Sequence, residues 1–347
     1  MKHLSAATAL GLLLCLEDRA GAQFDLVIAP GPGLAANPLA LAAVNRAAAA
    51  WAARISDPIT ITVNADFAGL GGGVWGNVSA VSLDAGYNTV RNQLVADAAN
   101  EADDAVVRFL PTAAQFTAIL PAGRALTGNL AGTKANLKAM GFAGLDGAFG
   151  AADGAVTFNS GMAFDFDSSD GVTAGTADLQ TLAARYIGRV LGFGSCVEAV
   201  NGGATAIVPT VLDLFRFTDD VVGQDPATTA QFTTFPRNLT PGRMVITDDL
   251  GREYAMSTGM VNGSFPGTDG YEAGHWKADV LSGTLVGVMN PTLASGVAYG
   301  PSDADFRALD LIGYEVASVP EPAAALLLLG GGGVLLRRRP RRTPDRG

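Results

Sequence analysis

DLQTLAARYIGRVLGFGS, residues 178–195, reads as one amphipathic helix that ends on a glycine. Apolar residues recur in it at helical spacing, namely Leu179, Leu182, Ala183, Ile187, Val190 and Leu191. Asp178 is a residue type that caps helix N-termini, and Gly192 is one that ends helices. The stretch therefore predicts a helix over residues 178–191 with one apolar face turned toward a core.

The polar positions of this helix have the spacing of a zinc-peptidase motif. Zinc hydrolysis from a helix needs histidines at i and i+4 on one face, and a glutamate beside the first to accept a proton from bound water. Arg185, Tyr186 and Arg189 occupy those positions here. Gly192 and Phe193 follow as in H-E-x-x-H-x-x-G-F. The spacing is kept while the chemistry has changed.

Two downstream segments extend the pattern. His275 precedes a tryptophan in GHWKADVLSG (274–283), and Met289 lies in GVMNPTLA (287–294). The order of helix frame, His-Trp pair and Met-Asn-Pro turn resembles the leishmanolysin-like branch of the metzincin peptidases. The chain is more similar still to secreted bacterial metalloproteases that end in a PEP-CTERM tail.

That resemblance covers nearly all of residues 23–316, from FDLVIAPGPGLAANP (24–38) through LDLFRF (212–217) to the last predicted helix. It implies an α/β (α+β) metzincin-like zinc-peptidase domain with a twisted sheet, an active-site helix and a loop-rich C-terminal half. Zinc-assisted peptide hydrolysis is the reaction it implies, with an edge strand near 155–160 aligning the substrate by strand addition. The implied site positions are Arg185 and Arg189 (first and second zinc ligands), Tyr186 (general base), His275 (third ligand) and Met289 (Met-turn).

The replacements argue against catalysis in this chain. Two guanidiniums, charged at any ordinary pH, occupy positions where a dication must bind. A tyrosine, with a reference pKa of about 10, is a poor base near neutrality. We therefore expect a pseudoprotease that keeps the substrate cleft, binds no zinc, and uses Arg185 and Arg189 to meet an acidic peptide or polysaccharide. The alternatives are an active metalloendopeptidase with a compensating ligand such as Glu272, or a non-enzymatic cell-surface or extracellular-matrix protein.

Both ends of the chain carry targeting patterns. Residues 1–22 combine an early lysine, a short apolar run and the small residues Ala-Gly-Ala before Gln23, which predicts a signal peptide and its signal peptidase. Residues 317–347 contain Pro-Glu-Pro, a short apolar run (323–336) and an arginine cluster. This tail resembles the PEP-CTERM sorting signal of diderm bacteria, which implies transient membrane anchoring, an exosortase partner and a secreted or cell-surface protein.

Composition limits the remaining function classes. The chain has 347 residues, a formal charge of −10 and 48% hydrophobic residues, which allows a sizeable core and disfavours disorder. Its acidic body argues against nucleic acid as a partner. Only His3 and His275 are histidines, so once the signal peptide is removed no mechanism with two histidines is possible. Cys196 is then the sole cysteine, either an inert buried thiol or a nucleophile beside His275.

The rest of the chain predicts an α/β opening. The other expected elements are strands at 24–30 and 57–67, helices at 37–55, 85–109 and 302–316, and an edge strand within 155–167. The glycine-rich stretch 69–77 is expected to be a loop and not a phosphate site, because no helix follows it directly. The carboxylates of DFDSSDG (165–171) are an alternative calcium site, although the glycine is out of step with an EF-hand loop.

Overall fold

The main sheet contains the strand that the alternating pattern predicts at 57–67. In the computed structural model, which describes residues 23–317 except 102 and 220, this strand is β2 (Thr60–Ala68). Three alternate residues near its start are buried, as a half-buried strand requires. β2 lies parallel to β1 (Asp25–Pro30) on one side and to β8 (Gly154–Asn159) on the other.

A fourth strand completes this sheet from outside. β3 (Gly76–Ala80) runs antiparallel to β8, and the strand order is β1-β2-β8-β3. The expectation of an edge strand near 155–160 is therefore wrong: those residues form β8, which lies inside the sheet, and β3 forms the edge. Strand order is a matter of long-range pairing, and the pattern of 155–167 carries no signal that β3 pairs outside it.

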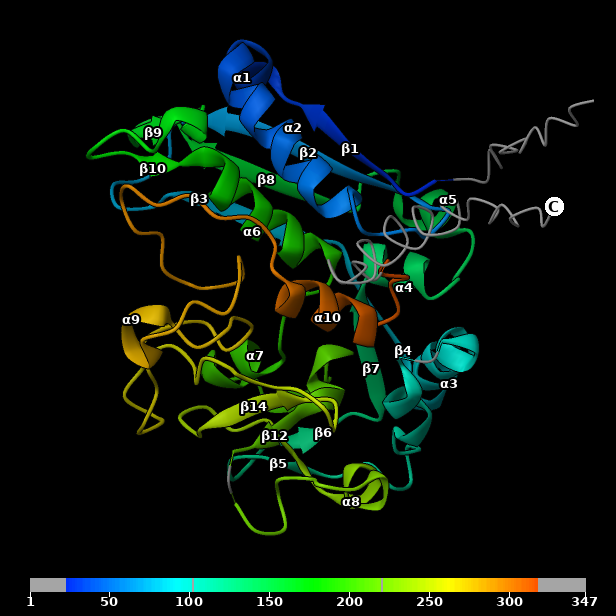
Figure 1. Ribbon diagram of the computed structural model, residues 1–347. Coiled ribbons are helices and arrows are strands. Elements are labelled where there is room, and N and C mark those ends of the chain that lie inside the picture. The colour runs from blue at the N-terminus through cyan, green and yellow to red at the C-terminus, as the bar shows by residue number, and fades with distance from the viewer. Residues whose placement is uncertain (1–22, 102, 220, 318–347) are drawn as a thin grey trace, which may run out of the picture.

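Two long helices cover one face of this sheet. α2 (Pro38–Ala52) and α6 (Leu179–Leu191) cross it side by side (Figure 1). The indole Nε1 of Trp51 donates to the carbonyl oxygen of Ala184 at 2.8 Å and joins the two helices. Asp178 caps α6 as the sequence predicts, accepting a backbone N–H in the first turn.

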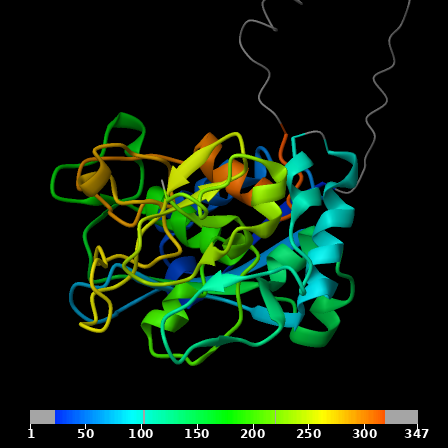
Figure 2. The same ribbon diagram turned by 90° about the horizontal axis from the view of Figure 1, so that it is seen from below.

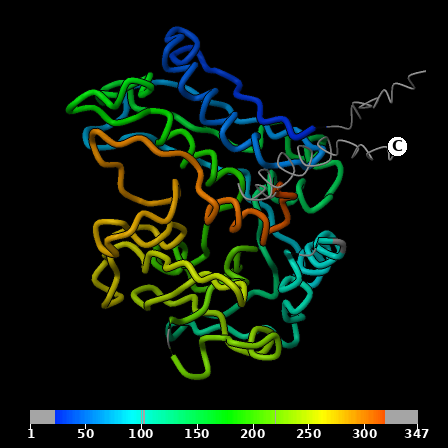
Figure 3. Tube along the Cα trace, in the orientation of Figure 1, coloured from blue at the N-terminus to red at the C-terminus, as the bar shows by residue number. Residues whose placement is uncertain are grey.

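The C-terminal half consists mostly of loops, as the tube in Figure 3 shows, and Figure 2 views this half from below. Its largest sheet is antiparallel and has the order β12-β14-β15, formed by β12 (Arg216–Thr218), β14 (Val245–Asp248) and β15 (Glu253–Ala255). α10 (Asp303–Leu311) lies between this half and α6 (Figure 1).

Short elements connect these parts. The remaining helices are α1 (Pro32–Ala35), α3 (Tyr87–Asp97), α4 (Lys134–Ala139), α5 (Leu145–Phe149), α7 (Val197–Asn201), α8 (Thr229–Thr234) and α9 (Asp279–Ser282). The remaining strands form two-stranded pairs: β4 (Ser82–Gly86) with β7 (Asn129–Thr133), β6 (Ala125–Leu126) with β11 (Ala206–Ile207), β5 (Ala118–Ile119) with β13 (Arg237–Asn238), and β9 (Phe164–Asp165) with β10 (Ala177–Asp178).

The fold is thus a mixed α/β arrangement. The helix expected over 37–55 ends three residues early, at Ala52, and two other predicted helices are shortened by more. The helix expected over 85–109 ends at Asp97, because Asn and Asp side chains, which compete for backbone hydrogen bonds, are frequent just after it. The last helix ends at Leu311 and not at 316, and Gly313 adopts a φ of 97° in the turn that follows.

None of the helices in the described part of the chain is both long and apolar enough to cross a bilayer. The predicted signal peptide (1–22), the apolar run 323–336 and the arginine-rich end of the predicted tail lie outside the described residues.

The buried carboxyl group of Asp57, which bonds the backbone near the end of the described chain, predicts a pH-dependent stability. Asp57 is 2% exposed and accepts the backbone N–H of Glu315 at 3.0 Å. Burial raises the pKa of Asp57 to about 7, above its unfolded value of about 4. Because the folded state holds this proton more tightly, Asp57 contributes stability below pH 4 that is lost as the pH rises to about 7.

We expect Asp57→Asn to have nearly the wild-type melting temperature at pH 4 and a higher one at pH 8, because asparagine resembles the protonated acid at any pH. Thermal unfolding of both proteins across this range measures the difference. An equal difference at every pH would mean that Asp57 does not titrate in this way.

Candidate functional site

The predicted site residues meet beneath α6. Met289 is fully buried under the middle of the helix, where Gly188 leaves room for it; a Cβ on Gly188 would lie 2.5 Å from the Met289 sulfur. The backbone N–H of Trp276, the residue after His275, donates to the Met289 carbonyl at 3.1 Å. The His275 segment and the Met289 turn are therefore bonded to each other and packed against α6.

Arg185 holds the chain just after Met289. Its Nη1 donates to three successive carbonyl oxygens, those of Asn290 at 2.8 Å, Pro291 at 2.7 Å and Thr292 at 3.2 Å. The side chain is buried, and burial lowers the pKa of its guanidinium from the usual value. At the position where the resemblance implies a first zinc ligand there is thus a cation that fixes the backbone of the turn.

Arg189, one helical turn further on, is held by carboxylates. Both guanidinium nitrogens Nη1 and Nη2 bond the Glu198 carboxylate, at 2.8 and 2.9 Å, and Nη2 lies 3.3 Å from that of Glu272. Burial alone would lower the pKa of Arg189, but the charge and hydrogen bonds of Glu198 raise it above its usual value. This bidentate pair ties α6 to α7.

His275 lies in the field of both guanidiniums. Its Nδ1 is 3.3 Å from the Glu272 carbonyl oxygen and 3.8 Å from the Glu272 carboxylate. Burial lowers the pKa of His275 well below its usual value, and the charges of Arg189 and Arg185 lower it further. The imidazole is therefore neutral at pH 7, and it lies close enough to both arginines to respond to their charge.

Tyr186 points to the sheet edge. Its hydroxyl donates to the carbonyl oxygen of Gly76 on β3 at 3.0 Å, and its ring stacks on Phe158 with centroids 6.0 Å apart. A Cβ on Gly76 would lie 2.7 Å from the Tyr186 ring, so a glycine is needed there. Burial raises the pKa of Tyr186, so near neutrality even less of it is deprotonated and able to act as a base than for an exposed tyrosine.

Zinc does not fit this set of side chains. A zinc site needs three or more nitrogen, sulfur or oxygen ligands. His275 offers an imidazole, but the nearby Glu272 carboxylate already faces Arg189. Arg185 and Arg189 cannot give up their protons to become ligands. No zinc-dependent step can be assigned to these residues.

A cavity of about 230 Å³ opens beside the Arg189 pair. Its lining includes Val78 and Ala80 of β3 together with Arg189, Glu198 and Ser195. On β3 the backbone groups of the odd-numbered residues form the hydrogen bonds to β8. The same alternation is seen just before β3, where the backbone N–H of Asn159 donates to the carbonyl oxygen of Trp75. Because antiparallel pairing alternates, the N–H and C=O groups of Val78 and Ala80 point to the open edge.

Two organising carboxylates were not foreseen from the sequence. Asp213 accepts hydrogen bonds from the Ser195 hydroxyl at 2.5 Å and the Cys196 N–H at 2.9 Å. Asp305 of α10 is fully buried and accepts the Trp276 indole N–H at 2.7 Å. Their signal in the sequence is slight, since isolated aspartates in polar stretches usually lie on the surface.

The other sequence-based candidates are weaker here. The Cys196 thiol is buried, and burial together with the charge of Asp213 raises its pKa well above the usual value, which disfavours a thiolate nucleophile. In the 165–171 loop, Asp165 accepts backbone N–H groups from Asp167 and Thr173. Its oxygens are therefore already used in shaping the loop.

No protein-family model matches the chain, and neither the search of curated proteins nor the search of solved structures returns a significant match. The functional argument is therefore made from the residues and their geometry.

Proposed function

We propose that this chain is a metzincin-like pseudopeptidase that binds an extended peptide and does not cleave it. One observation carries the proposal. The His275 segment and the Met289 turn pack against α6, and the two positions on α6 at which the resemblance implies zinc ligands hold arginines that bond the protein itself. Arginines that are bonded within the protein at these two positions support binding without chemistry.

The edge of β3 supports a peptide ligand. The outward N–H and C=O groups of Val78 and Ala80 lie beside the cavity and can pair with an added strand. A polysaccharide has no regularly spaced amide groups to match this edge, so a peptide is favoured over a polysaccharide. The Tyr186 hydroxyl already bonds the carbonyl oxygen of Gly76, so the free part of the edge begins after Gly76.

The arginines have a different role from the one the sequence suggests. Arg185 bonds three carbonyls and Arg189 bonds Glu198. Both guanidiniums are thus engaged within the protein, and an acidic ligand would have to displace those partners. In this proposal the backbone of β3 recognises the peptide, and the arginines hold the walls of the site.

The two alternative functions, an active peptidase and a non-enzymatic surface protein, make different demands on these residues. An active metalloendopeptidase would need Glu272 to leave Arg189 and join His275 as a ligand, which would leave a buried cation without its second carboxylate. A non-enzymatic surface or matrix protein would share the absence of catalysis but would not need the open edge of β3.

The proposal also includes export of the domain from the cell. A signal peptide over 1–22 and a PEP-CTERM tail over 317–347, processed by signal peptidase and an exosortase, would place the domain outside a diderm cell after transient membrane anchoring. Detection of the mature chain in culture medium or on the cell surface, with its tail removed, tests this part alone.

Substitution of Val78 by proline tests the binding edge. Its N–H points outward, so proline leaves the bonds to β8 intact while it removes a donor and blocks an added strand. We expect the wild-type protein to bind fluorescein-labelled β-casein, an unfolded probe, without cutting it. Fluorescence anisotropy should show at least about tenfold weaker binding by Val78→Pro.

Val78→Thr is the matched control, since it keeps the N–H and the β-branched shape, and it should bind casein like the wild type. Equal binding by Val78→Pro and Val78→Thr would contradict the proposed edge. Casein cleavage that a zinc chelator abolishes would contradict the proposed absence of catalysis.

A further inference from the structure

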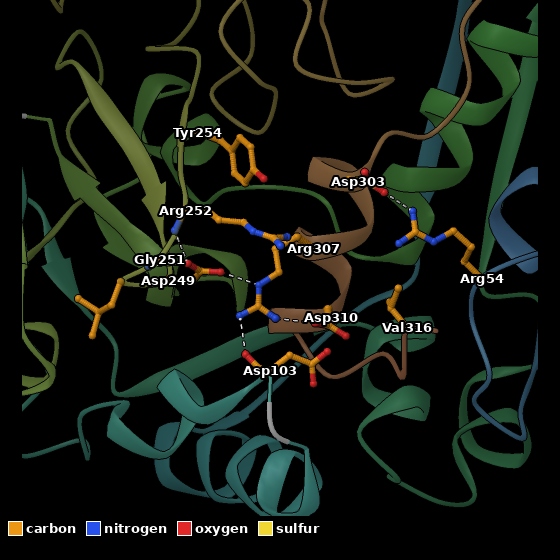
Figure 4. A pocket seen from close by; sticks show the side chains of 11 residues that line it. Arg54, Asp103, Asp249, Gly251, Arg252, Tyr254, Asp303, Arg307, Asp310 and Val316 are labelled. Carbon is orange, nitrogen blue, oxygen red and sulfur yellow. Dashed lines mark hydrogen bonds and ion pairs between the residues drawn. The ribbon is translucent and has the colours of Figure 1, made fainter. Parts of the chain in front are cut away.

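A second cavity, of about 730 Å³, lies beside α10, and its charged side chains pair with one another. Figure 4 shows the Arg307 guanidinium between two carboxylates, those of Asp249 at 2.6 Å and Asp310 at 2.5 Å. On the other side of the cavity, Arg54 lies 2.5 Å from Asp303. Because these charges are balanced within the protein, the cavity indicates no particular ligand.

The start of the described chain offers a group of a different kind. Gln23 is exposed, whereas Phe24 is 3% exposed and belongs to the hydrophobic core. Pairing of β1 with β2 begins one residue later, where the backbone N–H of Asp25 donates to the carbonyl oxygen of Ile59 at 2.9 Å. Gln23 therefore precedes both the core and the sheet, so neither core packing nor strand pairing holds its backbone nitrogen.

Removal of the predicted signal peptide would make Gln23 the first residue of the mature protein. The small residues Ala20, Gly21 and Ala22 directly precede it and predict cleavage after Ala22. The inference below thus rests on the export that the proposed function includes, and it is independent of the peptide edge of β3. Cleavage turns the Gln23 nitrogen into a primary amine. An α-amine has a reference pKa of about 8, so about one-tenth of it is uncharged and nucleophilic at pH 7.

We propose that the mature N-terminus is a pyroglutamate formed from Gln23. The uncharged amine nitrogen attacks Cδ of its own side-chain amide, and a bond forms between the two atoms. The bond from Cδ to Nε2 then breaks, and ammonia leaves with a proton from the attacking amine. The product is a five-membered lactam, and the step needs no oxidant, cofactor or second substrate. An exposed glutamine ahead of the first strand bond can fold back on its own amine in this way.

The lactam would change the end of β1 in two ways. It removes the positive charge of the α-ammonium group, and it leaves no free amine for an aminopeptidase to recognise. Trimming beyond Gln23 would remove Phe24, the first residue of the chain that is buried in the core. The modification would therefore protect a core anchor of a protein that is exposed to external peptidases.

Mass spectrometry of the mature protein, collected from the cells that export it, tests the proposal. The intact mass should be measured before and after incubation at 37 °C and pH 8, so that cyclisation during digestion is recognised. The N-terminal tryptic peptide, residues 23–46, should then be sequenced. We expect this peptide to be about 17 Da lighter than its sequence requires, the mass of one ammonia, and to resist amine labelling.

Gln23→Met is the matched control, because it keeps a long side chain but has no amide carbon to attack. Its peptide should keep the full mass and a reactive amine. An aminopeptidase should remove residue 23 from this variant, but not from the wild type until a pyroglutamyl peptidase has removed the lactam residue. A mature chain that starts at an uncyclised Gln23 after the incubation would overturn the lactam and leave export intact. A chain that starts at any other residue would overturn both the lactam and the cleavage position.

Discussion

Arg185→Ala should destabilise the protein by about 3–5 kcal/mol, lowering the melting temperature by roughly 10 °C. The guanidinium is buried and donates to the carbonyls of Asn290, Pro291 and Thr292. Alanine leaves these acceptors without a donor and opens a cavity under α6. Chemical denaturation at pH 7 measures the change in the free energy of unfolding.

Arg46→Ala is the matched control. Arg46 also bonds α6, through Gln180, but from an exposed position on α2, so its loss should cost less than about 1 kcal/mol. Arg185→Lys should fall between the two, because an ammonium group can reach fewer of the carbonyls. If Arg185→Ala cost no more than Arg46→Ala, the guanidinium would not be holding the turn after Met289.

Asp305→Ala should have an effect of similar size, at least about 4 kcal/mol. Asp305 is fully buried and accepts four N–H groups: the Trp276 indole at 2.7 Å and the backbone of Val288 at 2.7 Å, Met289 at 3.2 Å and Ser302 at 2.8 Å. Its loss leaves all four N–H donors without an acceptor at once. Near-ultraviolet circular dichroism should also change, since Trp276 loses its anchor.

Asp303→Ala, on the same helix, provides the comparison. Asp303 is largely exposed and pairs with Arg54, and exposed ion pairs contribute little. We expect a loss of less than about 1 kcal/mol. Equal losses for Asp303→Ala and Asp305→Ala would mean that the carboxylate of Asp305 does not organise the Met289 turn.

The sequence predicts α6 well because the information is local. Asp178, the apolar spacing and Gly192 define the start, face and end of the helix within one short stretch. The same holds for β1, α2 and β2, whose patterns need no distant partner. The mixed α/β class follows from these elements.

The site was only partly predictable. The juxtaposition of His275 and Met289 with α6 came from the resemblance, not from spacing. The partners of Arg189 could not be foreseen, because Glu198 lies in a different helix and Glu272 far along the chain. Nor could the free edge of β3, which depends on strand order. Contacts between distant residues decide these features, and single-sequence patterns do not encode them visibly.

The zinc content of the purified protein tests the central claim most directly. The protein should be incubated with excess ZnCl₂ and then dialysed, beside the variant Arg185→His/Tyr186→Glu/Arg189→His, and both measured by plasma mass spectrometry. We predict much less than one zinc per chain in the wild type, and more in the variant, whose two new histidines on α6 together with His275 bring the site to three histidines. One tightly held zinc per wild-type chain, lost on His275→Ala, would contradict the account.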